Sequence, residues 1–221
     1  MNPTFTLEVL GASIPDTVVI SALLTAVIGL TAWLASRRLR TRDASAWQVA
    51  LEGLTGWIDG TIGDVVEEDP RPYAPLIGGL MIFIGACNVL SVVPRIRPPT
   101  ADLATPVALA LIVFLAVPAY GVWRRGLLGY LGTYLQPTPL LLPLNILGDL
   151  TRTLALCVRL FGNALSGQMI GAILLAVAGF LVPVPLLLLG LLSGLIQAYI
   201  FGILAAVFIS AAIQVEETHH D

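Results

Sequence analysis

The sequence predicts an all-α integral membrane protein. We expect about five membrane-embedded helices plus one amphipathic surface helix, because a spanning helix needs roughly 20 apolar residues. The last two helices are expected to be long, strongly tilted and paired as a hairpin. Of the 221 residues, 57% are hydrophobic and only 11% are charged, whereas soluble domains average about 25% charged residues. This composition excludes soluble enzymes, DNA-binding domains and disulfide-stapled secreted domains.

The first crossing is expected at 16–36, after an external segment 1–15. Acidic residues, Glu8 and Asp16, precede this apolar run, and a cluster of arginines follows it from Arg37 to Arg42. A cleaved signal peptide carries its charges in the opposite order. The pattern therefore predicts a retained helix whose N-terminus lies outside and whose C-terminal end lies in the cytoplasm.

The segment 44–69 is polar enough to be wet but carries a helical stripe of apolar residues at spacings of three and four: Leu51, Leu54, Ile58, Ile62 and Val65. This pattern predicts an amphipathic helix on the cytoplasmic membrane surface or against a partner subunit. An ordinary connecting helix is the alternative.

The second and third crossings are expected at 72–94 and 103–123, as a hairpin with an external loop. The third crossing is followed by Arg124 and Arg125, which are typical of a cytoplasmic anchor.

Two unusually long apolar helices are expected at 139–182 and 185–214, followed by a cytoplasmic tail at 215–221. The helical pattern from Pro139 to Gly179 would extend about 60 Å, roughly twice the hydrocarbon thickness. Such a helix has to tilt steeply, kink or run partly along the membrane plane. The same reasoning applies to the last helix.

Nearly every polar group of the first long helix falls on one stripe when residues are placed at 100° intervals. The stripe comprises Asn145, Asp149, Arg152, Arg159, Asn163 and Ser166. Gln168 falls on the opposite face, where it could meet Ser193 or Gln197 of the following helix.

Arg159 lacks a partner within its own helix. Asp149 and Arg152 are three residues apart and can pair, but no other carboxylate occurs in an apolar segment. A charged arginine in mid-bilayer costs about 3 kcal/mol or more. We therefore expect Arg159 to meet a carboxylate on a second subunit. A snorkelling arginine near a helix end is the alternative.

No metal site, cofactor or nucleic-acid partner is expected. Cys87 and Cys157 lie within apolar segments, and the two histidines, His219 and His220, lie at the chain end. An intramembrane enzyme would need an embedded nucleophile with a base, or a metal cluster. The sequence therefore predicts no catalytic site of the chain's own.

The stretch from Leu154 to Gly167, with its core Arg159-Leu-Phe-Gly-Asn163, resembles the signature of subunit a of the F-type ATP synthase. Four further features of the family agree: Gln197-Ala-Tyr199 in the last helix, Pro99-Thr-Ala-Asp102 in the external loop, Asn88 before Pro94, and the acidic pair Glu216-Glu217. The resemblance covers the chain from about Tyr73 onward. The short N-terminus resembles the compact N-type branch of these ATPases.

The resemblance implies a stator subunit of the membrane (Fo) sector in a bacterial plasma membrane, with a ring of c subunits and peripheral-stalk b-type subunits as partners. Arg159 would lie between two half-channels and face the ring carboxylates. Residues lining or supporting the half-channels would be Asn163, Gln168, Ser193, Gln197, Asn88, Ser166, Asp149 and Arg152. The translocated ion would be a proton or sodium, with protons slightly favoured.

Two positions depart from the family pattern. Many members have Glu where this chain has Gln168, and a polar or ionisable residue near Gly190. Asp149 and Arg152 are candidate substitutes on the polar stripe. Two other readings compete: an independent transporter or channel that uses Arg159 as an ion or substrate site, and a purely structural scaffold.

Overall fold

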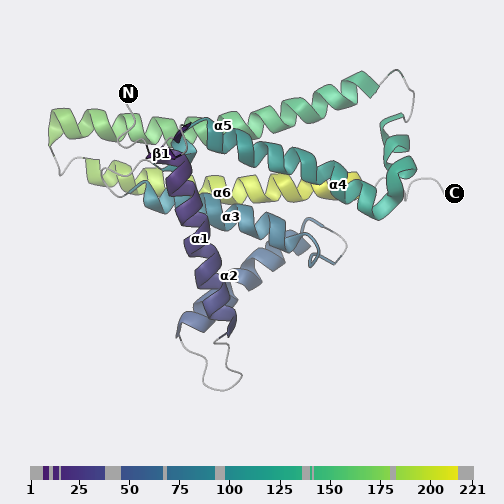
Figure 1. Cartoon of the computed structure of the whole chain (residues 1–221), viewed down its shortest axis with the longest axis horizontal. Helices are drawn as coiled ribbons and strands as arrows, with labels where there is room; N and C mark the ends of the chain where they lie inside the picture. The colour runs from purple at the N-terminus through teal and green to yellow at the C-terminus, as the bar shows by residue number, and fades with distance from the viewer. Residues whose placement is uncertain are drawn as a thin grey trace.

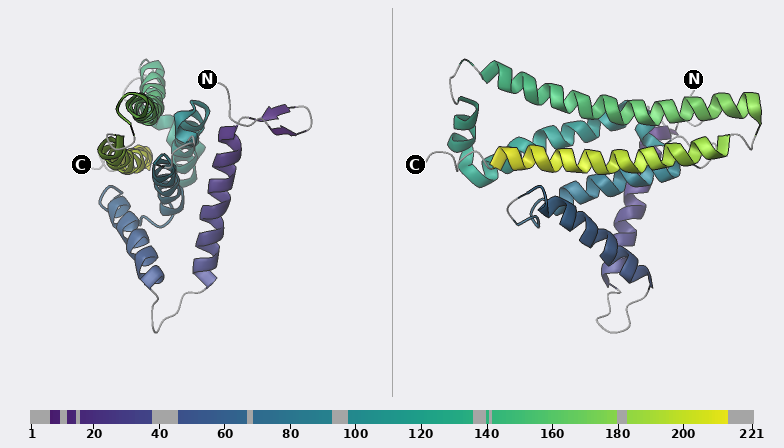
Figure 2. Two further views of the ribbon diagram at one scale, coloured as in Figure 1. Left: turned by 90° about the vertical axis from the view of Figure 1, so that its left-hand side faces the viewer. Right: turned by 180° about the vertical axis from the view of Figure 1, so that it is seen from behind.

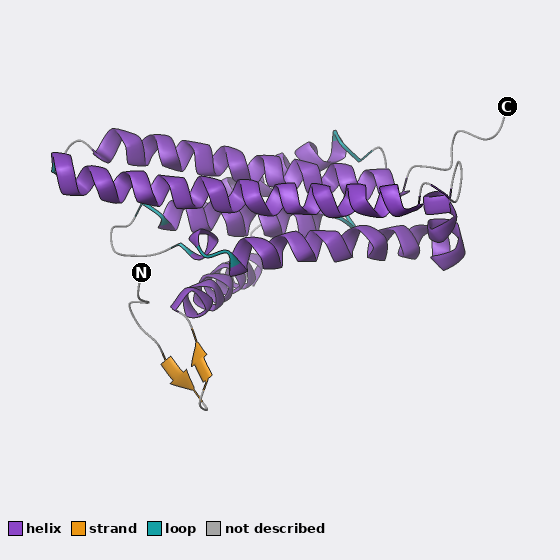
Figure 3. Ribbon diagram, turned by 90° about the horizontal axis from the view of Figure 1, so that it is seen from above, coloured by secondary structure: helices purple, strands orange, loops and turns teal. Residues whose placement is uncertain are grey.

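The computed structural model describes residues 7–9, 12–14, 16–37, 46–66, 69–92, 98–135, 140, 142–179 and 183–213. The predicted tail 215–221 and the loop positions 93–97 lie outside these ranges. The described chain is helical except for a short antiparallel hairpin, β1 (Leu7–Val9) and β2 (Ala12–Ile14) (Figure 3). The all-α membrane prediction is confirmed. The small hairpin was not expected, because strands of three residues are too short to leave a periodicity.

The helices follow in chain order: α1 (Asp16–Arg37), α2 (Ala46–Gly63), α3 (Ala74–Leu90), the short η1 (Pro99–Ala101), α4 (Ala104–Leu135), α5 (Leu142–Ala178) and α6 (Pro183–Ile213). Within the described residues, α1, α4, α5 and α6 are long and apolar enough to cross a membrane, and α3 is a shorter apolar helix.

The predicted long hairpin is present. With 37 and 31 residues, α5 and α6 extend about 55 Å and 46 Å at 1.5 Å per residue, well beyond the roughly 30 Å of a hydrocarbon core. Figures 1 and 2 show α3, α4, α5 and α6 side by side, with α1 crossing them steeply. Because the 22 residues of α1 suit an upright crossing, α5 and α6 must lie strongly tilted in the same membrane.

Helix α4 contains a kink where the third crossing was expected to end. Gly126 has φ 73° and ψ 167°, a backbone conformation essentially restricted to glycine. The chain then continues as a second helical piece to Leu135, which sequence reasoning did not predict. Tyr130 of this piece is buried against Gly121, where an added Cβ would lie 2.5 Å from the tyrosine ring.

Two buried clusters hold the helices together. The first joins α2, α3 and α6, with Ile58, Ile62, Tyr73, Ile77, Met81, Ala206, Ile209 and Ile213 among its members. The second joins α3, α4, α5 and α6 through Leu80, Ile84, Leu109, Val113, Leu156, Leu160, Ala198, Phe201 and Ala205. Through Leu156 and Leu160, the second cluster holds α5 beside its polar stripe.

Only part of the apolar stripe on α2 packs inside the protein. Ile58 and Ile62 are buried, whereas Leu51 and Leu54 remain exposed. Trp57 stacks on Tyr199 of α6, with ring centroids 5.5 Å apart. The second half of α2 therefore anchors the helix to α3 and α6, and its first half presents apolar side chains outward.

Candidate functional site

Arg159 lies on the exposed side of α5. The adjacent side of the helix, which carries Leu156 and Leu160, is packed inside the protein, each of these residues being 1% exposed. Among the described residues, Arg159 has no hydrogen-bond or ion-pair partner, and an added Cβ at Gly162, nearly one turn away, would meet no atom within 4 Å. We call the surface formed by Arg159, Gly162 and Ser166 the outer face of α5. The guanidinium is thus presented outward, and no described residue neutralises it.

Asn163, about one turn beyond Arg159, connects α5 to α6. Ser193 Oγ donates a hydrogen bond of 2.9 Å to Asn163 Oδ1. The prediction that Gln168 would meet Ser193 or Gln197 is wrong: Ser193 is paired with Asn163, and Gln168 makes no hydrogen bond within the described chain. The reason is geometric, since the edge of the polar stripe that carries Asn163, rather than the face that carries Gln168, borders α6 at Ser193.

Asn88 holds α3 against α6. Its Nδ2 donates hydrogen bonds to the carbonyl oxygens of Gly194 (2.8 Å) and Ile84 (2.9 Å). Asn88 is buried, and an added Cβ at Gly194 would lie 2.5 Å from its Cγ. Glycine at position 194 is therefore what allows the asparagine to approach the backbone of α6.

Gln197 follows Ser193 by one turn on α6 and is 6% exposed. Its Nε2 atom has no hydrogen-bond partner among the described residues. A buried amide without a partner is costly, and such groups are usually satisfied by an ordered water molecule. This amide donor marks a point among the described helices where an ordered water would be stabilised.

Asp149 and Arg152 form the pair that their spacing predicted. Arg152 Nη1 lies 3.8 Å from Asp149 Oδ1, and the Arg152 guanidinium carbon lies 5.7 Å from the ring centroid of Phe208 on α6. Ten residues separate Asp149 from Arg159, which is about 15 Å along the helix. The pair is therefore separate from Arg159 and does not neutralise it.

The remaining predicted residue, Ser166, is satisfied locally, because its Oγ donates to the Asn163 carbonyl oxygen at 3.1 Å. The structure thus gathers Asn163, Ser193, Asn88 and Gln197 around the α3–α6–α5 junction. It leaves Arg159 on the outer face, places Asp149 and Arg152 nearer the start of α5, and leaves Gln168 outside the group. No cluster of potential metal ligands occurs within the described ranges.

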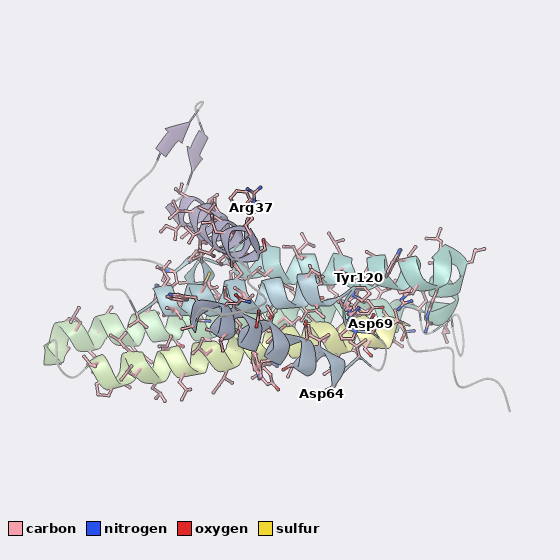
Figure 4. All side chains as sticks on the ribbon, turned by 90° about the horizontal axis from the view of Figure 1, so that it is seen from below. Arg37, Asp64, Asp69 and Tyr120 are labelled. Carbon is pink, nitrogen blue, oxygen red and sulfur yellow. The ribbon has the colours of Figure 1, made fainter. Side chains whose placement is uncertain are left out.

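Sequence reasoning missed a set of contacts at the kink of α4. Arg124 Nε donates to the Tyr73 hydroxyl at 3.1 Å, and the Tyr120 hydroxyl donates to the Pro72 carbonyl at 3.2 Å. Figure 4 places Tyr120 near Asp69, beside the start of α3. The only signal in the sequence was the Arg124-Arg125 pair itself, which predicted an anchor but not its partners.

Comparison with known proteins agrees with the geometry. Residues 18–210 match the family of the ATP synthase A chain. The chain is 48% identical over 209 residues to "ATP synthase subunit a 2" of Acaryochloris marina, which covers 94% of this chain and 89% of the relative. It is 50% identical over 186 residues to "ATP synthase subunit a 1" of Chlorobaculum parvum, covering 84% and 82% respectively.

A third relative, "ATP synthase subunit a" of Nitrosospira multiformis, is 48% identical over 197 residues, covering 89% of this chain and 78% of the relative. The family match and these identities extend over most of the chain, and the family match includes all the residues of the site. The long apolar helices make it a multi-pass membrane protein. The chain therefore belongs to the ATP synthase subunit a family, whose members act in proton translocation within the stator of the membrane sector.

Proposed function

We propose that this chain couples the translocation of a proton, or of sodium, to the rotation of a ring of c subunits, by providing two half-channels and one essential arginine. The observation that carries the proposal is Arg159. It lies on an exposed helix face without a partner among the described residues, and positions 160–215 carry no charged residue.

Arg159 would act on the ring electrostatically. An opposite charge within about 4–6 Å favours the ionised form of a carboxylate, so a passing ring carboxylate would release its ion beside the guanidinium. The fixed positive charge would also oppose the direct passage of cations between the two half-channels. The membrane potential contributes about 2.3 kcal/mol per charge for each 100 mV.

The half-channel lining would be composed of amides and hydroxyls. Asn163 and Ser193 join α5 to α6, Asn88 lies behind them, and the buried Gln197 amide needs a partner such as water. Gln168 and Gly190, the two departures from the family pattern noted above, carry no ionisable side chain. We therefore propose conduction along ordered water, with Asp149 and Arg152 supporting a separate section of the path.

The proposed orientation has the N-terminus outside and the C-terminus in the cytoplasm of a bacterial plasma membrane. In that orientation, the exposed apolar half of α2, including Trp47 at 80% exposure, would contact the cytoplasmic membrane surface or the b-type subunits of the peripheral stalk. The ring would cover the outer face of α5.

The test is ATP-driven acidification of inverted vesicles that carry the assembled complex, comparing wild type with Arg159→Ala. Arg71→Ala is the matched control, because the side chain of Arg71 is 90% exposed and lies outside the long helices. We expect Arg159→Ala to assemble but not to pump, and Arg71→Ala to pump normally. Normal pumping by assembled Arg159→Ala would overturn the proposal. Inhibition of acidification by added sodium would indicate competition at the ring.

A further inference from the structure

The end of α6 and the start of α3 both meet α4 at its kink. Arg125 Nε donates to the carbonyl oxygen of Ile213, the last residue of α6, at 3.0 Å, and Arg125 Nη2 donates to the same oxygen. The neighbouring Arg124 donates a hydrogen bond to the hydroxyl of Tyr73, just before the start of α3. The end of α6 and the start of α3 are therefore both tied to the same point on α4.

The contact between Arg125 and Ile213 addresses a specific physical need. The last carbonyl groups of a helix have no partner within the helix and carry partial negative charge. An arginine can supply two N–H donors in a fixed fork, and hydrogen bonds from a charged donor are stronger than neutral ones. Arg125 thus caps α6 through a tertiary contact.

The kink fixes the position from which Arg125 acts. Gly126 adopts its glycine-only conformation directly after Arg125, and Tyr130 folds back onto Gly121. The glycine allows the break, and the tyrosine stabilises the returning piece. The arginine is consequently presented at the end of a rigid helical segment rather than on a free loop.

We infer that Arg125 is a positioning residue for ion translocation, which fixes the axial register of α6 against α3, α4 and α5. The inference rests on the proposed function, because Ser193 and Gln197 are carried by α6. Where α6 crosses α3, Asn88 and Met81 of α3 pack against Gly194 and Gly202, and the hydrogen bond from Arg125 adds a second restraint at the C-terminal end of α6. A slide by one residue moves a helix about 1.5 Å, enough to break the hydrogen bond between Ser193 and Asn163.

The structure offers a reporter for this register. An added Cβ at Gly85 of α3 would lie 4.0 Å from the Cβ of Ala198, within the usual separation for a disulfide. We would place Gly85→Cys with Ala198→Cys in a background in which Cys87 and Cys157 are alanine. The rate of disulfide formation then reports whether α6 is in its native register.

The experiment compares Arg125→Gln, Arg125→Lys and the exposed-site control Arg71→Gln in the assembled complex. Losing a hydrogen bond to a charged group should slow disulfide formation about threefold or more in Arg125→Gln. The same variant should pump fewer protons per ATP hydrolysed, and oxidation of the cysteine pair should restore pumping. Arg125→Lys keeps the charge but not the paired N–H donors of arginine, so its disulfide rate and its pumping should lie between those of wild type and Arg125→Gln. Arg71→Gln should match wild type in both.

Several results would overturn the inference. They are an unchanged disulfide rate in Arg125→Gln, a loss of pumping that oxidation does not restore, or a block of pumping by the oxidised pair when Arg125 is intact. If Arg125→Gln does not assemble, the disulfide rate and pumping of Arg125→Lys decide the question. Arg159→Ala in the same background separates the two claims: if it pumps, the proposed function fails. If Arg159→Ala does not pump but Arg125→Gln has the disulfide rate and pumping of wild type, the register inference alone fails.

Discussion

The α3–α6 interface and the outer face of α5 each combine a glycine with a polar side chain, but only at the interface do these residues contact other described helices. At the interface, Gly194 is filled by Asn88, whose amide is bonded to two carbonyl oxygens. On the outer face, Gly162 meets no neighbouring atom, and Arg159 has no partner within the described chain. The comparison shows that the packing at the interface is complete within the described helices, whereas the outer face of α5 leaves Arg159 without a partner there, as the proposed contact with the ring requires.

The strongest test of this comparison replaces a tightly packed glycine and an unpacked glycine by alanine. Gly194→Ala should destabilise the subunit by about 1–3 kcal/mol through overpacking, because the new methyl group would overlap Cβ, Cγ and Oδ1 of Asn88. Gly190→Ala is the matched control on the same helix, where an added Cβ meets nothing within 4 Å.

The measurement is the fraction of subunit retained in the complex after a temperature ramp in detergent. We expect Gly190→Ala to equal or exceed wild type, because alanine favours the helix by up to about 1 kcal/mol. Equal retention of the two alanine variants would contradict the close packing of Asn88 against Gly194.

A second, smaller effect is expected from the polar half of the same contact. Asn88→Leu removes both hydrogen bonds while retaining apolar bulk, and should cost about 1 kcal/mol in the same assay. Ser91→Ala serves as control, since Ser91 Oγ donates only to the Asn88 carbonyl of its own helix. If Asn88→Leu retained full stability but abolished pumping, Asn88 would serve the ion path rather than the packing.

The smallest effect on stability, and the most informative about the outer face, is expected from Gly162→Ala. The subunit alone should be unchanged or slightly more stable, because nothing opposes the added methyl group. In the assembled complex the methyl group would separate α5 from the ring, so ATP-driven pumping should fall about twofold or more. Unchanged pumping would indicate that no partner approaches this face closely.

Much of this arrangement follows from rules of length and spacing. The long tilted hairpin was predicted because α5 and α6 exceed the membrane thickness, and the Asp149–Arg152 pair because residues three apart face each other on a helix. The exposure of Arg159 follows from the lack of a second carboxylate in the apolar segments. Each of these features follows from the length or the residue spacing of individual helices and from the membrane around them.

Features that depend on two helices were not predictable from the sequence. The pairing of Ser193 with Asn163, rather than with Gln168, depends on the rotation and axial offset of α6, which no local pattern encodes. The same holds for the contact of Arg125 with the last carbonyl of α6. The kink at Gly126 was missed because an isolated glycine in an apolar helix is common and only its neighbours force the positive φ.

The central claim, that Arg159 faces the ring carboxylates, is tested most directly by disulfide cross-linking in the assembled complex. A cysteine at Gly162 would be paired with a cysteine beside the ring carboxylate, and Leu23→Cys on α1, 66% exposed, is the control. We expect Gly162→Cys to cross-link to the ring under mild oxidation and Leu23→Cys not to. A failure of Gly162→Cys to cross-link in complexes that pump normally would contradict the account.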